Sequence, residues 1–234
     1  MMTATIPDTL PRAILFDWDN TLVSNWGCVV ASINAALTAF GMEPWTMEEG
    51  YKRIRHSLRD SFPTIFGDDW HRARDIFYAH FEQNHIAYLE PLAGAERLLK
   101  ELHASGIYLA VVSNKKGQFL RAEATHLGWD GYFGRLVGAT DAPTDKPAVA
   151  PVEMALSPSG IPPGRDVWFV GDADVDMECA HRAGCLPVLV GSTPTDGPNL
   201  DRFPPAYRLD GCAAISALVQ RIGDTISVKA AARP

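Results

Sequence analysis

Two carboxylates with one residue between them, Asp17 and Asp19, follow an apolar run of Ile14, Leu15 and Phe16. Such a run predicts a buried strand that ends where the acids begin. Two carboxylates this close do not both stay ionised at low cost unless a cation joins them. The pair therefore indicates a nucleophile or a metal site, and on this stretch alone an acidic turn at a strand end is an equal alternative.

Two later apolar runs end in the same way. Ser113 and Asn114 follow the first of them, and Asp172 and Asp176 follow the second. In a parallel sheet the carboxyl ends of the strands lie at one edge, where ligands bind. Three strand ends that all become polar are therefore expected to form one site.

The residue types in this set favour a particular chemistry. Carboxylate ligands without His or Cys favour a hard ion such as Mg²⁺, which commonly contacts phosphate oxygens. Ser113 and Asn114 can donate hydrogen bonds to such oxygens, and Lys146 is the best candidate to balance the charge. These are the components of phosphoryl transfer through a carboxylate nucleophile.

Hydrophobic periodicity predicts the elements that position these side chains. Strands are expected at residues 12–17, 107–112, 132–138, 167–170 and 186–190. Helices are expected between them, one of which opens at Pro91, and a last helix over 211–222 precedes a frayed end at 224–234. Alternating strands and helices predict a parallel sheet that is covered on both faces.

The segment from residue 22 to 88 has helical patterns and no convincing strand. Its expected helices span 26–40, 47–58 and 70–81, with a loop at 61–67. We therefore predict a core domain of residues 1–21 and 89–234 with a helical insertion of residues 22–88.

Charge and composition restrict the partners. The 234-residue chain has a formal net charge of -7, whereas a generic nucleic-acid binder is expected to be basic. The four cysteines form no CxxC pair and do not alternate with histidines at zinc-ligand spacing. The sequence has no basic segment followed by an apolar core at its start and no apolar run of bilayer length. We expect a soluble cytoplasmic protein with reduced thiols and no membrane or nucleic-acid partner.

These residues resemble the haloacid dehalogenase (HAD) superfamily, in its phosphatase branch of phosphoglycolate phosphatases and β-phosphoglucomutases. Four motifs stand in the family's order: Asp17-Trp18-Asp19-Asn20-Thr21, Ser113-Asn114, Lys146-Pro147 and Gly171-Asp172-Ala173-Asp174-Val175-Asp176. Each motif is weak alone, but the four in order across residues 12–191 are specific. The resemblance implies an α/β fold, with a Rossmann-like parallel sheet in three α/β/α layers and the helical insertion as a C1-type cap.

The resemblance also implies roles in catalysis. Asp17 would attack phosphorus and become an aspartyl-phosphate. Asp19 would protonate the leaving oxygen and then activate water. Ser113 would bind a phosphoryl oxygen, and Lys146 would offset the negative charge of the nucleophile and the phosphoryl group.

A metal site and supporting contacts follow from the same resemblance. Asp17, the backbone carbonyl of Asp19, and Asp172 would hold Mg²⁺, with Asp176 acting in the second coordination sphere or through a water molecule. Two further hydrogen-bonding residues are implied at the phosphate: Thr21 and Asn114.

A basic cluster in the insertion has two interpretations. Arg55 and Arg59, spaced to share one helix face, could grip an anionic substrate, although a solvated helix face is the more common origin of such a cluster. Lys115 is either a helper at the phosphate site or a surface residue, and Trp18 receives no chemical role.

The leading hypothesis is a Mg²⁺-dependent phosphatase that acts on a small phosphorylated metabolite, with phosphoglycolate as a guess from the resemblance. Asp19 favours phosphate chemistry over carbon–halogen cleavage, because the dehalogenases of the superfamily lack this acid. The mutases of the superfamily usually carry a histidine in the first linker helix. Residues 22–40 contain no histidine, so the resemblance disfavours a mutase. A phosphomutase or phosphotransferase and a catalytically silent phospho-ligand binder are the alternatives, and both a monomer and a homodimer are compatible with the sequence.

Overall fold

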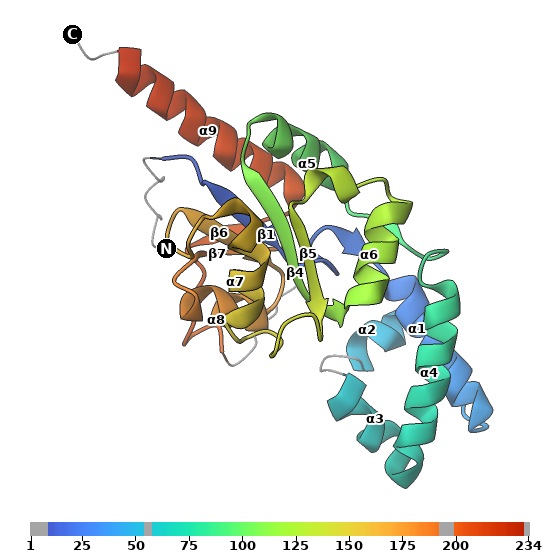
Figure 1. Cartoon of the computed structure of the whole chain (residues 1–234). Coiled ribbons are helices and arrows are strands. Elements are labelled where there is room, and N and C mark those ends of the chain that lie inside the picture. Colours follow the sequence, from blue (N-terminus) through green and yellow to red (C-terminus); the bar gives the residue numbers. More distant parts are fainter. Residues whose placement is uncertain (1–8, 54–57, 192–198, 232–234) are drawn as a thin grey trace. The chain divides into compact units, whose positions relative to one another are not determined.

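The computed structural model describes residues 9–53, 58–191 and 199–231. The chain divides into two compact units (Figure 1). Met1–Val23 and Pro91–Pro234 form the core unit, and Ser24–Glu90 form the helical unit. Within the described residues, every helix is too short or too polar to cross a bilayer.

The core unit is built on a six-stranded sheet in which all neighbouring strands are parallel. In spatial order the strands are β5 (Arg135–Ala139), β4 (Tyr108–Lys116), β1 (Ala13–Phe16), β6 (Val167–Gly171), β7 (Leu186–Val190) and β8 (Tyr207–Leu209). The five predicted strands are confirmed. The sixth, β8, was missed because it is short and only partly buried, so it lacks a continuous apolar run.

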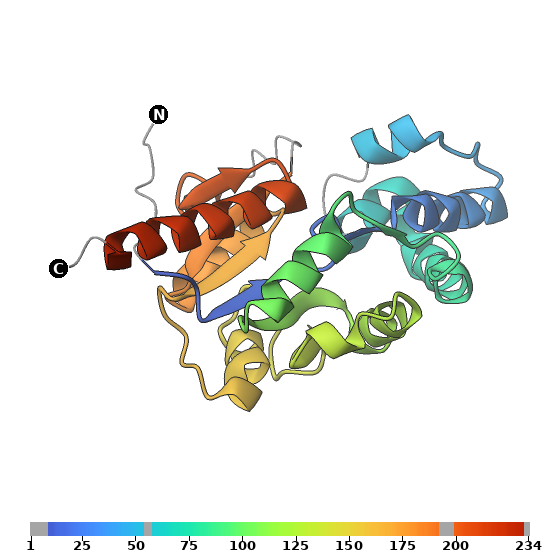
Figure 2. The ribbon, with the colours of Figure 1, turned by 90° about the horizontal axis from the view of Figure 1, so that it is seen from above.

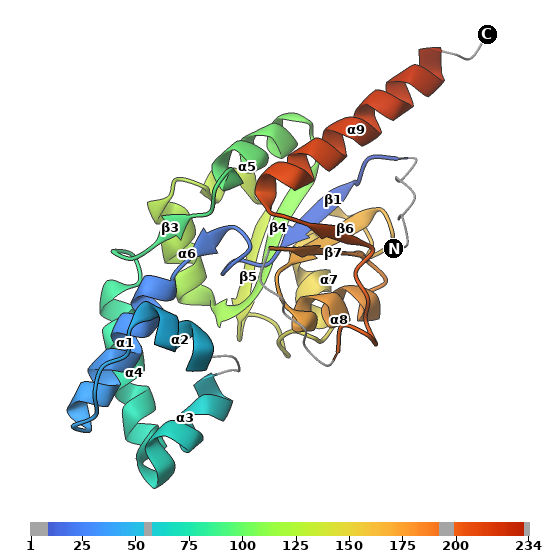
Figure 3. The same ribbon diagram turned by 180° about the vertical axis from the view of Figure 1, so that it is seen from behind.

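Helices cover both faces of this sheet. Their bounds are α5 (Ala95–Ala104), α6 (Gly117–His126), α7 (Ala150–Leu156), α8 (Asp174–Arg182) and α9 (Cys212–Ala231), with 3₁₀ turns η2 (Asp130–Tyr132) and η3 (Ser157–Ser159). In Figure 1 α7 and α8 lie in front of the sheet, and in Figure 3 α5 and α9 lie in front of it. From above, α9 and α7 lie on opposite sides (Figure 2). The predicted three-layer α/β/α architecture is therefore confirmed.

The central strand β1 is buried along its whole length, which explains its unbroken apolar sequence. On one face of the sheet, Leu15 and Phe169 pack with Val152 of α7 and Ala180 of α8. This burial holds β1 between β4 and β6, so the residues that follow β1 and β6 lie at one edge of the sheet.

The helical unit consists of α1 (Trp26–Ala39), α2 (Met47–Arg53), α3 (Leu58–Phe66), the 3₁₀ turn η1 (Gly67–Asp69) and α4 (Trp70–Asn84). The predicted loop at 61–67 is wrong, because α3 continues through Pro63. A proline inside a helix costs about 3 kcal/mol. Here Phe62 and Phe66 are buried, and the Phe62 ring lies 5.7 Å from that of Phe77. We infer that this apolar contact outweighs the lost hydrogen bond.

Other boundaries also differ from the sequence prediction. Two short strands, β2 (Val23–Ser24) and β3 (Glu90–Pro91), form a separate two-stranded sheet. Pro91 therefore does not open a helix, and α5 begins at Ala95 after Gly94 in a left-handed conformation. The end of the chain is helical as far as Ala231 rather than frayed from residue 224.

Replacing Leu15 with Ala should lower the free energy of unfolding by about 2–5 kcal/mol, because the side chain is fully buried and the close-packed sheet cannot fill the cavity. Urea denaturation measures this change. Val228→Ala, at a side chain that is 69% exposed, is the control and should change it by less than about 0.5 kcal/mol. Equal losses would contradict this assignment of the core.

Candidate active site

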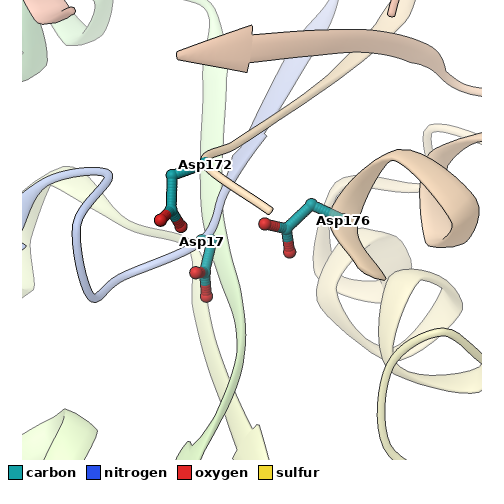
Figure 4. A group of neighbouring side chains, drawn as sticks. All are labelled: Asp17, Asp172 and Asp176. Atoms are coloured by element: carbon teal, nitrogen blue, oxygen red, sulfur yellow. The ribbon is translucent and has the colours of Figure 1, made fainter. Parts of the chain in front are cut away.

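Three carboxylates meet at the edge of the sheet (Figure 4). Asp17 follows β1, Asp172 follows β6, and Asp176 lies in the first turn of α8. One oxygen from each lies within 4.8 Å of the others. The backbone N–H of Asp17 donates to the Val170 carbonyl at 2.8 Å, which extends the β1–β6 pairing to the site.

Gly171 allows Asp176 to reach this position. A Cβ atom at residue 171 would lie 2.3 Å from Asp176 Cγ, which is far inside contact distance. The backbone N–H of Ala173 donates to Asp176 Oδ2 at 3.1 Å and holds the carboxylate in place. A larger residue at 171 would therefore displace a carboxylate of the site.

Lys146 supplies the positive charge among these acids. Its buried Nζ atom donates to Asp17 Oδ1 and to Asp176 Oδ1, both at 2.7 Å. With Asp172, three carboxylates face one ammonium, so two negative charges stay uncompensated when all three acids are ionised. An all-oxygen donor set with this charge fits a hard divalent cation such as Mg²⁺.

Burial and mutual repulsion shift the acidity of these groups. Burial, with the charges of Asp17 and Asp176, raises the pKa of Asp172 to about 8. Burial also raises the pKa of Asp176 to about 6, although Lys146 opposes this shift. Burial alone would lower the pKa of Lys146, but the two carboxylates that it contacts raise it above its ordinary value. Without a cation, Asp172 therefore retains a proton into the neutral range.

Asn114 holds the main chain of Lys146. Its side-chain Nδ2 donates to the Lys146 carbonyl at 3.2 Å, and its Oδ1 accepts from the Lys146 N–H at 3.0 Å. These contacts position the lysine, and the predicted role of Asn114 at the phosphate stays a prediction. Both Asn114 and the nearly buried Ser113 lie within β4 rather than after it, where the pairing with β5 becomes irregular.

Thr21 lies in the turn that follows Asp19. Its backbone N–H donates to the Trp18 carbonyl at 3.3 Å. Its Oγ1 atom is buried and has no hydrogen-bond partner among the described residues. The hydroxyl is thus enclosed by the protein, and its predicted contact with phosphate stays a prediction.

Asp19 belongs to a second charged network that the sequence analysis did not identify. Lys115 Nζ lies 2.8 Å from Asp19 Oδ1 and 2.8 Å from Glu123 Oε2. Trp18 Nε1 donates to the same Glu123 oxygen at 2.6 Å. Burial raises the pKa of Asp19, and the Lys115 charge opposes that increase. Lys115 is thus a buried partner of the predicted acid–base residue rather than a surface lysine.

One signal could have revealed this network. Glu123 lies four residues after Phe119 on α6, so a carboxylate occupies the apolar stripe of that helix. The Glu123 side chain is fully buried, and a buried carboxylate requires charged or hydrogen-bonding partners. Lys115, eight residues earlier, was the available cation.

The structure describes only part of the basic cluster that was predicted to bind an anionic substrate. Arg55 lies outside the described residues, and Arg59 is described only as part of helix α3. The neighbouring Lys52 pairs with Glu48 at 2.6 Å on an exposed helix surface, which fits the interpretation as a solvated face for that residue.

The doubly wound sheet of the core unit places the carboxylate triad at the carboxyl ends of parallel strands, where ligands bind in this class of fold. Residues 14–190 match the family described as haloacid dehalogenase-like hydrolase. The chain therefore belongs to the haloacid dehalogenase-like hydrolases, and the inserted helical region is consistent with a C1-type cap.

Known proteins resemble the chain over most of its length. It is 30% identical over 179 residues to a phosphoglycolate phosphatase from Aquifex aeolicus, covering 76% of this chain and 84% of that protein. A crystal structure of a predicted phosphoglycolate phosphatase from Haemophilus somnus is 25% identical, with a TM-score of 0.77 and coverage of 91% and 99%. A haloacid dehalogenase-like hydrolase from Streptococcus pneumoniae, 20% identical with a TM-score of 0.76 and coverage of 89% and 97%, shares the fold.

The acidity of the triad leads to a prediction on metal binding. Between pH 3.8 and about 8, Asp172 is protonated in the metal-free folded protein and ionised in the unfolded chain. The protonated carboxyl therefore contributes to folding stability, fully below pH 3.8, and this contribution is lost as the pH rises through about 8. Because Mg²⁺ must displace that proton, the increase in Tm on adding Mg²⁺ should be larger at pH 8 than at pH 6.

Thermal denaturation with and without Mg²⁺ at the two pH values measures this difference. Asp172→Asn should remove most of the Mg²⁺ effect and its dependence on pH. Asp174→Asn, at a neighbouring carboxylate outside the triad, should retain both. An identical Mg²⁺ effect at both pH values would contradict the link between Asp172 and the cation.

Proposed function

We propose that this hydrolase is a Mg²⁺-dependent phosphatase that acts on a small phosphorylated metabolite through an aspartyl-phosphate. The observation that carries the proposal is the meeting of Asp17, Asp172 and Asp176 around the Lys146 ammonium in a haloacid dehalogenase-like chain. This arrangement offers a nucleophilic carboxylate beside a site for a divalent cation and an anion.

In the first half-reaction, a carboxylate oxygen of Asp17 attacks phosphorus, and the bond between phosphorus and the ester oxygen breaks. Asp19 donates a proton to that oxygen, so the product leaves as an alcohol. The raised pKa of Asp19 favours its protonated form and suits this role. The Ser113 hydroxyl binds a phosphoryl oxygen, and Lys146 offsets negative charge on Asp17 and the phosphoryl group.

In the second half-reaction, Asp19 accepts a proton from a water molecule as the water oxygen attacks phosphorus. The acyl-phosphate bond breaks, which regenerates the Asp17 carboxylate and releases inorganic phosphate. When bound, Mg²⁺ supplies charge stabilisation for the phosphoryl oxygens. Asp17, Asp172 and the backbone carbonyl of Asp19 would hold the ion, with Asp176 supporting them directly or through water.

The substrate proposal depends on the relatives. Phosphoglycolate is the first candidate, because the similar protein from Aquifex aeolicus is named a phosphoglycolate phosphatase and the one from Haemophilus somnus a predicted phosphoglycolate phosphatase. We also propose that the insertion predicted at residues 22–88 acts as a cap that selects the substrate and excludes water during the first half-reaction.

Asp17→Asn should reduce phosphate release by at least about 10⁴-fold, because an amide cannot replace the nucleophilic carboxylate. Release is measured from a panel of phosphorylated metabolites with Mg²⁺ and then with EDTA. Asp174→Asn is the matched control and should keep most of the activity. Activity that survives in Asp17→Asn would exclude the proposed nucleophile, and conversion of one sugar phosphate into its isomer without phosphate release would indicate a mutase.

A further inference from the structure

Lys115 is buried beside Asp19 even though it lies near the end of a strand. Its side chain is 5% exposed and contacts the Asp19 and Glu123 carboxylates at 2.8 Å each. A lysine held by two carboxylates in a buried position is a fixed charge rather than a mobile surface group. Lys115 therefore contacts the side chain that is proposed to transfer the proton.

Glu123 and Trp18 fix the position of Lys115. The Glu123 side chain is fully buried, and one of its oxygens accepts from both Lys115 Nζ and Trp18 Nε1. The Trp18 ring is also fully buried and packs edge-on against Trp129, with ring centres 5.8 Å apart. This arrangement links the loop of Asp19 to helix α6 through directed hydrogen bonds, so little side-chain freedom is left in the network.

The two buried lysines have different partners. Lys146 contacts Asp17 and Asp176 in the metal-binding triad, where it offsets the charge of the nucleophile. Lys115 pairs with Oδ1 of Asp19 and with Glu123. One oxygen of the Asp19 carboxyl, Oδ1, is therefore held by an ion pair.

We propose that Lys115, held by Glu123 and Trp18, is a positioning residue that orients the Asp19 carboxyl toward the leaving oxygen. This inference rests on the proposed phosphatase function. In this role the network would assist protonation of poor leaving groups such as alkoxides, which need a proton to leave. The alternative is that Lys115 binds the substrate phosphate itself.

The test compares Lys115→Met with Lys116→Met, which changes the adjacent exposed lysine. Each protein hydrolyses two substrates: its best alkyl phosphate and p-nitrophenyl phosphate, whose leaving group needs no proton. For Lys115→Met we expect kcat on the alkyl phosphate to fall about 10²-fold with KM almost unchanged, because general acid catalysis contributes on this scale. Lys116→Met should behave as the wild type.

With p-nitrophenyl phosphate the first half-reaction should survive in Lys115→Met, whereas the attack of water on the phosphoenzyme should slow. A rapid burst of nitrophenolate followed by slow turnover is therefore expected in stopped flow. A purely structural role for Lys115 would not make the loss depend on the leaving group. The affinity for inorganic phosphate, measured by calorimetry with Mg²⁺ present, should change by less than about 2-fold.

Folding is controlled by a second variant. Lys115→Met leaves the buried Glu123 carboxylate without its cation, whereas Lys115→Met combined with Glu123→Gln removes that charge and keeps an oxygen that accepts from Trp18. The double variant should fold as the wild type and show the same dependence on the leaving group.

Equal losses in the rate of the first half-reaction with both substrates, with a higher KM and weaker binding of inorganic phosphate, would overturn the proposal in favour of a direct phosphate contact. Unchanged kinetics in both variants would also overturn it and leave Lys115 a structural residue. Wild-type protein that releases no phosphate from either substrate would reject the proposed function itself. Phosphate release by wild type and Lys116→Met, with none by Asp17→Asn, would support the proposed function. The result for Lys115→Met then tests the role of Lys115 separately.

Discussion

The interaction on which this site depends is the repulsion between carboxylates at the ends of two adjacent strands. Asp17 and Asp172 follow the two adjacent strands from which the chain continues toward opposite sides of the sheet, and this is where ligands bind in doubly wound folds. Asp176 adds a third negative charge, and Lys146 is the buried cation that contacts this group. The charge that remains is the reason why a divalent cation fits and why the pKa values of Asp172 and Asp176 are raised in the metal-free protein.

A second balance of charges lies beside the first. The residues of the Asp17-Trp18-Asp19 turn divide between two environments, since Trp18 packs in the interior while its two neighbours meet lysines. A turn whose central ring is anchored has few alternative conformations, which keeps both carboxylates in place without a substrate. Burying Glu123 carries a desolvation cost, and the ion pair and the indole hydrogen bond offset that cost.

The helical unit illustrates how packing decides local structure. Helix α3 includes Pro63, and the aromatic contacts of Phe62 and Phe66 explain why this residue does not end it. The described basic residues of α2, Lys52 and Arg53, pair with acids one turn away on the same helix. These two side chains are therefore engaged within their own helix, and the core site is the better-defined part of the chemistry.

The sequence by itself determined the class of fold, the family and the main charged residues, because buried parallel strands are continuous apolar runs and the acids follow them directly. It did not reveal β8, whose partial burial leaves no apolar pattern, or the helix through Pro63, which depends on contacts between distant aromatic rings. Only the tertiary structure decided that Asn114 holds Lys146 and that Lys115 joins Asp19 to Glu123. The contact between Lys115 and Asp19 joins residues that are 96 positions apart, and spacing along the chain does not indicate which side chains meet across such a separation.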